Sequence, residues 1–154
     1  MQLSRFTDYA LRVLIFVGRQ GGRVCTMSEI AAYHRISHEH LRKVTHKLAK
    51  LGYLASRRGR GGGIVLGADP ASMRIGDIIL ATEKDLAIVD CDALDCILSP
   101  GCSLKRALDR GGRAFIAALN EVTLADLLVD RQMKQQFKRI DFASGDGTRT
   151  DRTS

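Results

Sequence analysis

No stretch of this 154-residue sequence is apolar for long enough to cross a membrane. The most apolar run near its start, Val13 to Val17, covers five residues, follows Arg12 and lacks the small-residue cleavage site of a signal peptide. These two absences predict a cytoplasmic protein without a membrane partner, in a reducing compartment where thiols stay available to metals. Because 45% of the residues are apolar, we expect one buried core and therefore a single domain.

Patterns that would indicate an enzyme or a nucleotide-binding protein are missing as well. The carboxylates and histidines show no recognised catalytic arrangement, and a binding role accounts for them. The glycine-rich stretch at residues 59–63 lacks the G-x-x-x-x-G-K-[ST] pattern of phosphate-binding loops. We therefore expect a binding protein that is not an enzyme.

The positive charge is concentrated in the first half of the chain. Residues 1–70 contain 12 Lys or Arg against 4 Asp or Glu, whereas residues 71–154 contain 12 against 13. The first half thus has a net charge of +8 and the second a net charge of −1. This division indicates one half that binds a polyanion, joined to a half with another task.

The first fifty residues have the spacing of three helices. Apolar side chains recur at helical intervals over residues 4–19, and a shorter helix is expected over about Met27 to Ala32, capped by Thr26 or Ser28. Ser37 is placed to cap a third, basic helix with the expected buried stripe Leu41, Val44, Leu48 and Leu51. Such a pair of helices forms a helix-turn-helix, whose second helix enters the DNA major groove. The alternative is an ordinary basic surface helix in a three-helix bundle.

Residues from Tyr53 to Leu66 favour the helix-turn-helix interpretation. Two short apolar segments flank a loop rich in Gly and Arg, which predicts a β-hairpin with a basic tip, the wing of a winged helix. The predicted fold class is therefore mainly α with a small β-hairpin wing. The positions expected to contact DNA are Ser37, His38, His40, Arg42, Lys43 and Thr45 in the recognition helix and Arg58, Arg60, Gly62 and Gly63 in the wing.

Three of the four cysteines, Cys91, Cys96 and Cys102, fall within twelve residues. Thiolates at such short spacing suit an iron–sulfur cluster, and Ser103 is placed to cap a following helix whose dipole would favour an anionic centre. A structural zinc ion and plain thiols or a disulfide are the alternatives. The odd number cannot all pair, and the C-x2-C pairs of zinc modules are absent. Cys25 stands apart and is expected to be an ordinary buried cysteine.

The remainder of the chain predicts further helices and a tail. A short helix is expected around Ile75 to Glu83, a long one from Ser103 to Asn120 that Gly111-Gly112 weakens, and a last one that Thr123 opens. The long helix has an apolar stripe that fits a dimer seam or packing within its own subunit: Leu104, Ala107, Leu108, Phe115, Ala118 and Leu119. The expected division is a regulator domain at 1–129, with a DNA-binding part at 1–70, a cysteine loop at 91–102 and a dimerisation helix at about 103–121. A polar, disordered tail is expected at 130–154.

Several of these motifs, in matching order, resemble the winged-helix iron–sulfur transcriptional regulators. The resemblance runs from Met1 to about Val129 and is strongest to the nitric oxide-sensitive, NsrR-like branch. It rests on the three cysteines and on four segments: Gln2 to Tyr9, Arg57 to Ile64, Arg74 to Ile78, and Thr123 to Leu127.

The resemblance implies that Cys91, Cys96 and Cys102 bind one iron–sulfur cluster per subunit of a homodimer, either 2Fe-2S or 4Fe-4S. Members of the IscR-like branch have a histidine shortly after the third cysteine, where this chain has Lys105. In NsrR-like members an aspartate from the first helix of the partner subunit can complete the site, and Asp8 occupies that position. A carboxylate is a harder and more easily displaced ligand than a thiolate, which suits a reactive cluster.

The function that the resemblance implies is a repressor that binds double-stranded operator DNA while the cluster is intact. Nitric oxide, the expected signal, would nitrosylate the cluster, release the operator and derepress nitrosative-stress defence genes. Two alternatives remain open at this stage: an iron- or redox-responsive regulator of the same fold, and a non-regulatory electron-transfer or cluster-carrier protein. An electron-transfer or cluster-carrier protein would have no use for the basic wing.

Overall fold

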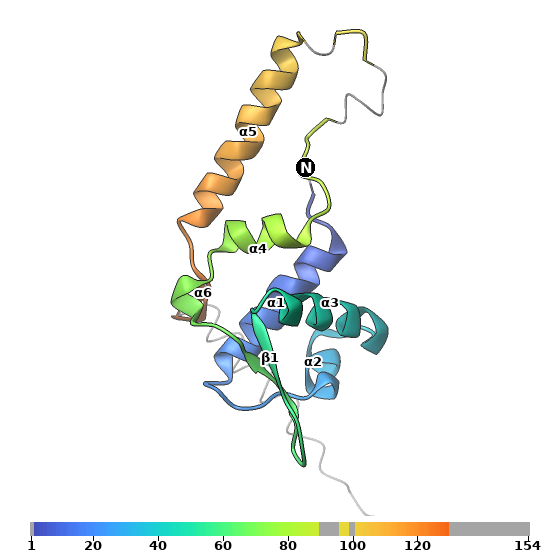
Figure 1. Ribbon diagram of the computed structural model, residues 1–154, viewed down its shortest axis with the longest axis vertical. Helices are drawn as coiled ribbons and strands as arrows, with labels where there is room; N and C mark the ends of the chain where they lie inside the picture. The colour runs from blue at the N-terminus through green and yellow to red at the C-terminus, as the bar shows by residue number, and fades with distance from the viewer. Residues whose placement is uncertain (1, 90–95, 99–100, 130–154) are drawn as a thin grey trace, which may run out of the picture.

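The structure, a computed structural model, describes residues 2–89, 96–98 and 101–129. Cys91 and the predicted tail lie outside these ranges. The elements in chain order are α1 (Arg5–Arg19), α2 (Met27–His34), α3 (His38–Lys50), β1 (Leu54–Arg57), β2 (Gly63–Leu66), the 3-10 turn η1 (Pro70–Ser72), α4 (Ile75–Thr82), α5 (Ser103–Asn120) and α6 (Leu124–Val129). The described part is mainly helical with one two-stranded antiparallel hairpin, as predicted (Figure 1).

Helix α1 lies at the centre of this arrangement and contacts α2, α3, α4, α6 and β2. The Ser4 hydroxyl caps it by accepting a hydrogen bond from the Thr7 N–H at 3.2 Å. Its apolar stripe is fully enclosed at Ala10, Val13 and Leu14. Because neighbours surround α1 on most sides, α2, α3 and the second half of the chain are all positioned against it.

The helix-turn-helix forms where the sequence predicts it. Thr26 caps α2 in a reciprocal pair with Glu29, and Ser37 caps α3. Two details of the prediction were wrong. Helix α2 runs on to His34 before Arg35 turns the chain in the left-handed region, with φ 53°. Leu51, expected in the buried stripe, is 37% exposed because α3 ends at Lys50 and the chain leaves the core there.

The hairpin pairs Leu54 with Leu66 and Arg57 with Gly63, so its tip spans residues 58–62. The N–H and carbonyl of Cys25 each bond to Ile64, at 2.9 and 2.8 Å, which attaches the hairpin to the segment before α2. A side chain at Gly63 would collide with the Cys25 carbonyl. Gly63 is therefore required for this close backbone approach.

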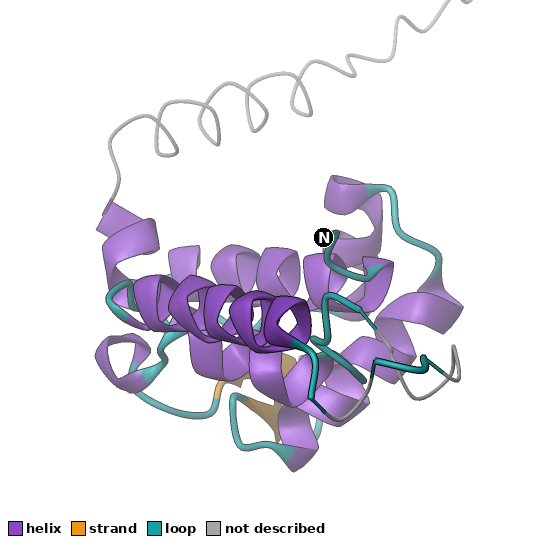
Figure 2. Ribbon diagram, turned by 90° about the horizontal axis from the view of Figure 1, so that it is seen from above, coloured by secondary structure: helices purple, strands orange, loops and turns teal. Residues whose placement is uncertain are grey.

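Helices α4, α5 and α6 form the second half of the fold. Helix α5 packs on α4, and its N-terminal end projects away from the hairpin (Figure 1). In the view from above α5 is the helix nearest the viewer (Figure 2). One prediction here was wrong: the N-cap is Cys102, not Ser103. The long helix covers Ser103–Asn120 as predicted and passes through Gly111-Gly112. The predicted capping pair of Thr123 and Asp126 at the start of α6 is present.

A hairpin that follows a helix-turn-helix is the winged-helix arrangement. Within the described residues, none of the helices combines the length and the apolar character that a membrane crossing needs.

Gly76 provides a test of the α4–α5 contact. A Cβ atom there would overlap the Asn120 side chain and come within 2.7 Å of the Ile116 carbonyl oxygen. We expect Gly76→Ala to lower the free energy of unfolding by about 1–3 kcal/mol, as overpacking does. Gly111→Ala is the matched control, because its Cβ meets no atom within 4 Å. It should be neutral or stabilising by up to about 1 kcal/mol. Urea denaturation at equal protein concentration measures both, and equal effects would contradict the close contact.

Candidate nucleic-acid interface and metal centre

The predicted recognition helix presents most of its expected contact residues to solvent. Ser37, His38, His40, Arg42 and Lys43 are all exposed. The Ser37 hydroxyl lies 2.7 Å from Nδ1 of His40, which fixes the imidazole beside the helix N-terminus. The His40 ring also meets the Tyr9 ring edge-on, with centroids 6.2 Å apart. These side chains stand at the N-terminal end of α3, the part of a recognition helix that reaches base edges.

Thr45 differs from the rest of the predicted set. Its side chain is buried, and its hydroxyl lies 2.9 Å from the Leu41 carbonyl oxygen of the preceding turn. A hydroxyl that is bonded to its own helix and faces inward is not presented to a ligand. Thr45 is therefore not part of the surface that α3 presents to solvent.

Glu39 lies on the same surface and was not singled out from the sequence. Its carboxylate forms an ion pair with Lys43 at 2.7 Å, and both side chains are exposed. The hydrogen bond from Lys43, with the nearby positive charges of Lys43, His40 and Arg42, holds the pKa of Glu39 below its ordinary value. The i,i+4 spacing of Glu and Lys on a predicted helix was the sequence signal for this pair.

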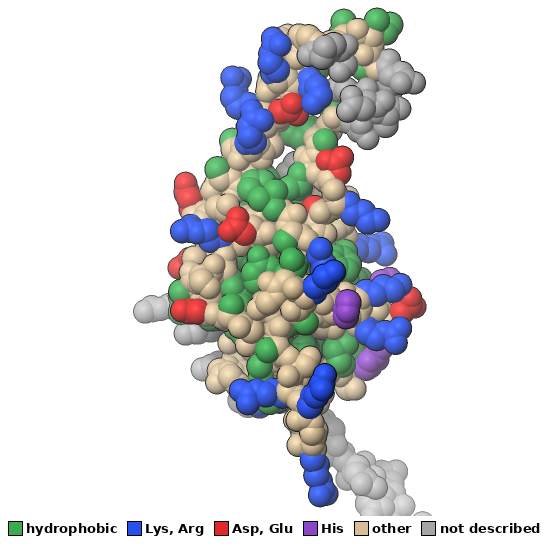
Figure 3. Space-filling view, in the orientation of Figure 1, with side chains coloured by type: hydrophobic (Ala, Val, Ile, Leu, Met, Phe, Trp, Pro, Cys, Tyr) green, Lys and Arg blue, Asp and Glu red, His purple; other side chains and the backbone are tan. Residues whose placement is uncertain are grey.

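The wing presents two arginines on a backbone shaped by glycine. Arg58 and Arg60 are exposed, and Gly59 and Gly61 between and after them adopt φ values of 106° and 82°. A Cβ at Gly62 would come within 2.6 Å of the Arg57 carbonyl oxygen. Figure 3 shows Lys and Arg side chains gathered over α3 and continuing to the tip of the hairpin.

Two of the predicted metal ligands, Cys96 and Cys102, belong to the segment that leads into α5, whose N-terminal end points away from the hairpin (Figure 1). Cys96 and Cys102 are half-buried free thiols, and Cys102 is the N-cap of α5. The Cys102 side chain makes no capping hydrogen bond, and its sulfur lies beside the first-turn N–H groups, at the positive end of the helix dipole. This environment fits a thiolate that holds an anionic cluster. The part of the chain that the structure describes contains no group of three potential metal ligands, and Cys91 lies outside it.

Asp8, the predicted fourth ligand, is in the first turn of α1. Its carboxylate forms an ion pair with Arg12 of the same helix at 2.9 Å. The two side chains are 45% and 52% exposed, so the pair is accessible from outside the subunit. As an exposed pair it contributes only about 0–1 kcal/mol, and breaking it would cost little.

Two hydrogen bonds tie the start of α1 to the end of α4. The Ser4 N–H donates to Oε1 of Glu83 at 2.7 Å, and the Thr7 hydroxyl donates to that of Thr82 at 3.0 Å. Thr7 and Thr82 are both buried. Glu83 is followed directly by the segment that leads to the cysteines. The start of α1, which carries Asp8, is therefore hydrogen-bonded to the end of α4, which precedes the cysteine segment in the sequence.

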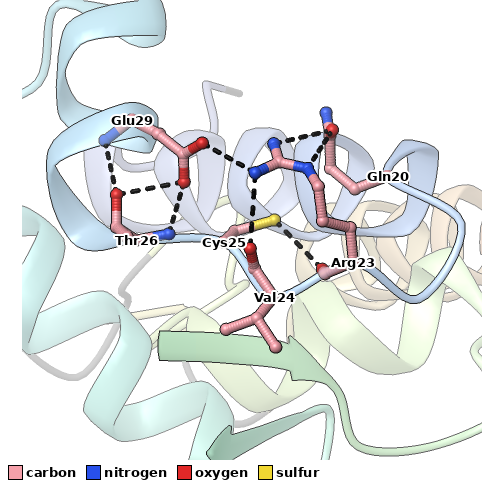
Figure 4. Close-up of polar contacts among 6 residues, drawn as sticks. All are labelled: Gln20, Arg23, Val24, Cys25, Thr26 and Glu29. Atoms are coloured by element: carbon pink, nitrogen blue, oxygen red, sulfur yellow. Dashed lines mark hydrogen bonds and ion pairs between the residues drawn. The ribbon is translucent and has the colours of Figure 1, made fainter. Parts of the chain in front are cut away.

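Cys25 is separate from this region. It lies between Arg23, which bonds to Gln20 and Glu29, and the capping residue Thr26 (Figure 4). The thiol is completely buried and lies 3.6 Å from the Arg23 carbonyl oxygen. Burial raises the pKa of this thiol. These features are those of a structural cysteine.

The hairpin after the helix-turn-helix and the basic surface that both share define a winged-helix protein of the DNA-binding type. The sequence model of one family, described as Rrf2, iron-dependent transcriptional regulator, matches residues 3–130. The chain therefore belongs to the Rrf2 family of transcriptional regulators, which confirms the resemblance noted from the sequence.

Individual relatives agree with this assignment. The chain is 43% identical over 136 residues to the HTH-type transcriptional regulator NsrR of Bacillus subtilis, a match that covers 86% of this chain and 93% of that protein. It is 45% identical over 135 residues to NsrR of Geobacillus kaustophilus, covering 85% and 92%. Among solved structures, CymR, the global cysteine regulator of B. subtilis, is 28% identical with a TM-score of 0.69, covering 83% and 96%. IscR of T. potens shares the fold at 24% identity, with a TM-score of 0.70 and coverage of 88% and 91%.

The burial of Cys25 predicts a difference in thiol reactivity. In metal-free folded protein Cys25 should react with a thiol reagent far more slowly than Cys96 or Cys102, because its raised pKa lowers the thiolate fraction at any pH below that pKa and its sulfur is enclosed. Cys25→Ala should leave the number of rapidly reacting thiols unchanged, whereas Cys102→Ala should remove one. Rapid labelling of Cys25 under native conditions, identified by peptide mass, would refute this assignment.

Proposed function

We propose that this transcriptional regulator is a nitric oxide-sensitive repressor that binds operator DNA as a homodimer when an iron–sulfur cluster is present. The observation that carries the proposal is the 43–45% identity to two NsrR regulators over 85–86% of the chain. The proposed ligands are Cys91, Cys96 and Cys102 of one subunit and Asp8 of the partner subunit. Three thiolates and one carboxylate suit a 2Fe-2S or a 4Fe-4S cluster.

The surface of α5 supports assembly into a homodimer. None of its 18 residues is buried within one chain, although the helix carries an apolar stripe. Leu104 is 64% exposed and Phe115 is 37% exposed. An apolar face of this length that remains accessible in a single chain fits an interface with a second copy, in which the same surface meets itself about a two-fold axis.

The bound cluster would supply iron that nitric oxide attacks. The residues of the protein would then transmit this reaction to the DNA-binding surface. For Asp8 to serve the partner subunit, it must leave Arg12, and this exchange costs little because the pair is exposed. A pull on Asp8 acts on α1, which packs directly on the recognition helix α3. Within one subunit, the Thr7–Thr82 hydrogen bond joins the start of α1 to the end of α4, from which the chain continues to the cysteines.

On the DNA side, α3 would enter the major groove and the wing would contact the backbone. Arg58 and Arg60 are free to pair with phosphates or enter the minor groove, and His38, His40, Arg42 and Lys43 face outward from α3. A dimer must place two such helices at half-site spacing. A change of roughly 3 kcal/mol in that alignment alters affinity more than a hundredfold, so a small shift of α1 is sufficient.

An iron-responsive regulator is the second candidate, because the family description itself reads iron-dependent. In that case, chelation of iron would release the operator and nitric oxide would have no separate physiological role. The fold and the ligands would be the same. The two candidates differ in whether low concentrations of nitric oxide act on protein that keeps its iron.

The main test titrates anaerobically purified protein with nitric oxide while following the visible spectrum and operator binding together. We expect operator affinity to fall in step with the spectral change. Cys96→Ala should be colourless and unable to bind the operator, because a thiolate ligand is lost. Cys25→Ala, the matched cysteine control, should keep both colour and binding. If metal-free protein bound its promoter as tightly as the loaded form, the sensing function would be disproved and a generic DNA-binding protein would remain.

The buried Thr7–Thr82 bond allows a test of the coupling. The double variant Thr7→Val/Thr82→Val replaces both hydroxyls with methyl groups of similar shape, so the free energy of unfolding should change by no more than about 1 kcal/mol. We expect cluster content to be unchanged while the difference in operator affinity between loaded and metal-free protein shrinks. Thr82→Ser, which keeps a hydroxyl, is the control. A double variant with an unchanged affinity difference would show that this bond takes no part in the coupling.

A further inference from the structure

Glu39 is the acidic residue in the otherwise basic and neutral sequence of α3. Its side chain is 67% exposed and lies three and four residues before Arg42 and Lys43, on the same face of the helix. Figure 3 shows an acidic side chain among the Lys, Arg and His side chains over the N-terminal end of α3. The carboxylate therefore belongs to the surface that faces DNA.

A carboxylate at this place opposes general DNA binding. It repels phosphates, whereas the surface around it is built to attract them. Its contribution to helix stability is small, since an exposed i,i+4 pair with Lys43 is worth about 0.3–0.5 kcal/mol. A negative charge that weakens contact with every sequence can still be useful if it favours one base over the others.

The donor and acceptor groups on the base edges in the major groove determine from which base a carboxylate can accept a hydrogen bond. Guanine presents two acceptors, N7 and O6, and thymine presents the acceptor O4 beside a methyl group. Adenine presents the donor N6 next to the acceptor N7, which repels a carboxylate. Cytosine presents the N4 amino donor without a neighbouring acceptor on the same base. An ionised Glu39 can therefore bond well only to cytosine.

We infer that Glu39 is a specificity-determining residue that accepts a hydrogen bond from the N4 amino group of a cytosine in each operator half-site. Lys43 holds the carboxylate at 2.7 Å in the free protein. On binding, Lys43 can turn to a phosphate or to O6 and N7 of a guanine, which releases Glu39 for the cytosine. Arg42, on the same face, can bond to guanine in the same way. This inference rests on the proposed operator-binding role of α3, and it does not depend on the identity of the signal.

The experiment selects duplexes from a randomised DNA library with cluster-loaded protein and compares variants. The unaltered protein should select a cytosine at one position in each half-site, with about tenfold or greater discrimination there. Glu39→Gln should prefer adenine at that position, because an amide can both donate to N7 and accept from N6. Glu39→Ala should show no preference there. Both variants should bind non-specific DNA several-fold more tightly, since a repulsive charge is gone.

Glu121→Gln is the matched control, because it removes one exposed negative charge at the end of α5, outside the recognition helix. It should select the same sequences as the unaltered protein. A merely helix-stabilising role for Glu39 would leave the selected motif unchanged in Glu39→Gln, and that result would overturn the inference. If the unaltered protein selected no motif at all, the proposed operator-binding function would itself fail. The two failures are therefore distinguishable.

Discussion

The burial of α1 is the constraint on which the rest of the structure depends. Ala10, Val13 and Leu14 are completely enclosed, and four helices and a strand pack against this one helix. A close-packed helix cannot shift alone, because its neighbours must move or lose contacts. The same helix carries Asp8 on its exposed side and supports α3 on another. In the proposed mechanism, a ligand bound to one side of α1 would therefore act directly on α3, the proposed recognition helix, because the two helices are in contact.

Much of the fold could be predicted because local signals and long-range packing agree. The caps at Ser4, Thr26 and Ser37 hydrogen-bond to N–H groups in the first turns, and the apolar periodicity of α1 and of α3 up to Leu48 matches the buried face of each helix. The wing follows from two apolar segments around a glycine-rich tip. In these regions each residue type prefers the conformation that the tertiary structure imposes, which is the condition for reliable interpretation of a single sequence.

Some predictions were wrong where the apolar spacing of a helix continues past the end of that helix. Another was wrong where two adjacent residues, Cys102 and Ser103, could each be the N-cap of α5. Leu51 keeps the helical spacing of Leu48, but the chain turns at Gly52, whose φ is 81°. Thr45 lies beside Val44 at the edge of the buried stripe, and only the packing of α3 decides that it faces inward. Glu39 was missed because a search for basic side chains passes over the acid among them. The proposed metal centre divides its ligands between two chains, so sequence can name them by type but not position them.

The glycines of the wing have a consequence for how tolerance to mutation should be interpreted. Gly63 faces the Cys25 carbonyl, Gly62 faces the Arg57 carbonyl, and Gly59 has a left-handed backbone. Each therefore has a conformational requirement that exists without any nucleic acid. A deep mutational scan, or a comparison of homologous genes, would find these positions intolerant for reasons of folding. Strict retention of glycine in this loop is consequently poor evidence of contact with DNA, and variation at the neighbouring arginines is the more informative record of changing operator preference.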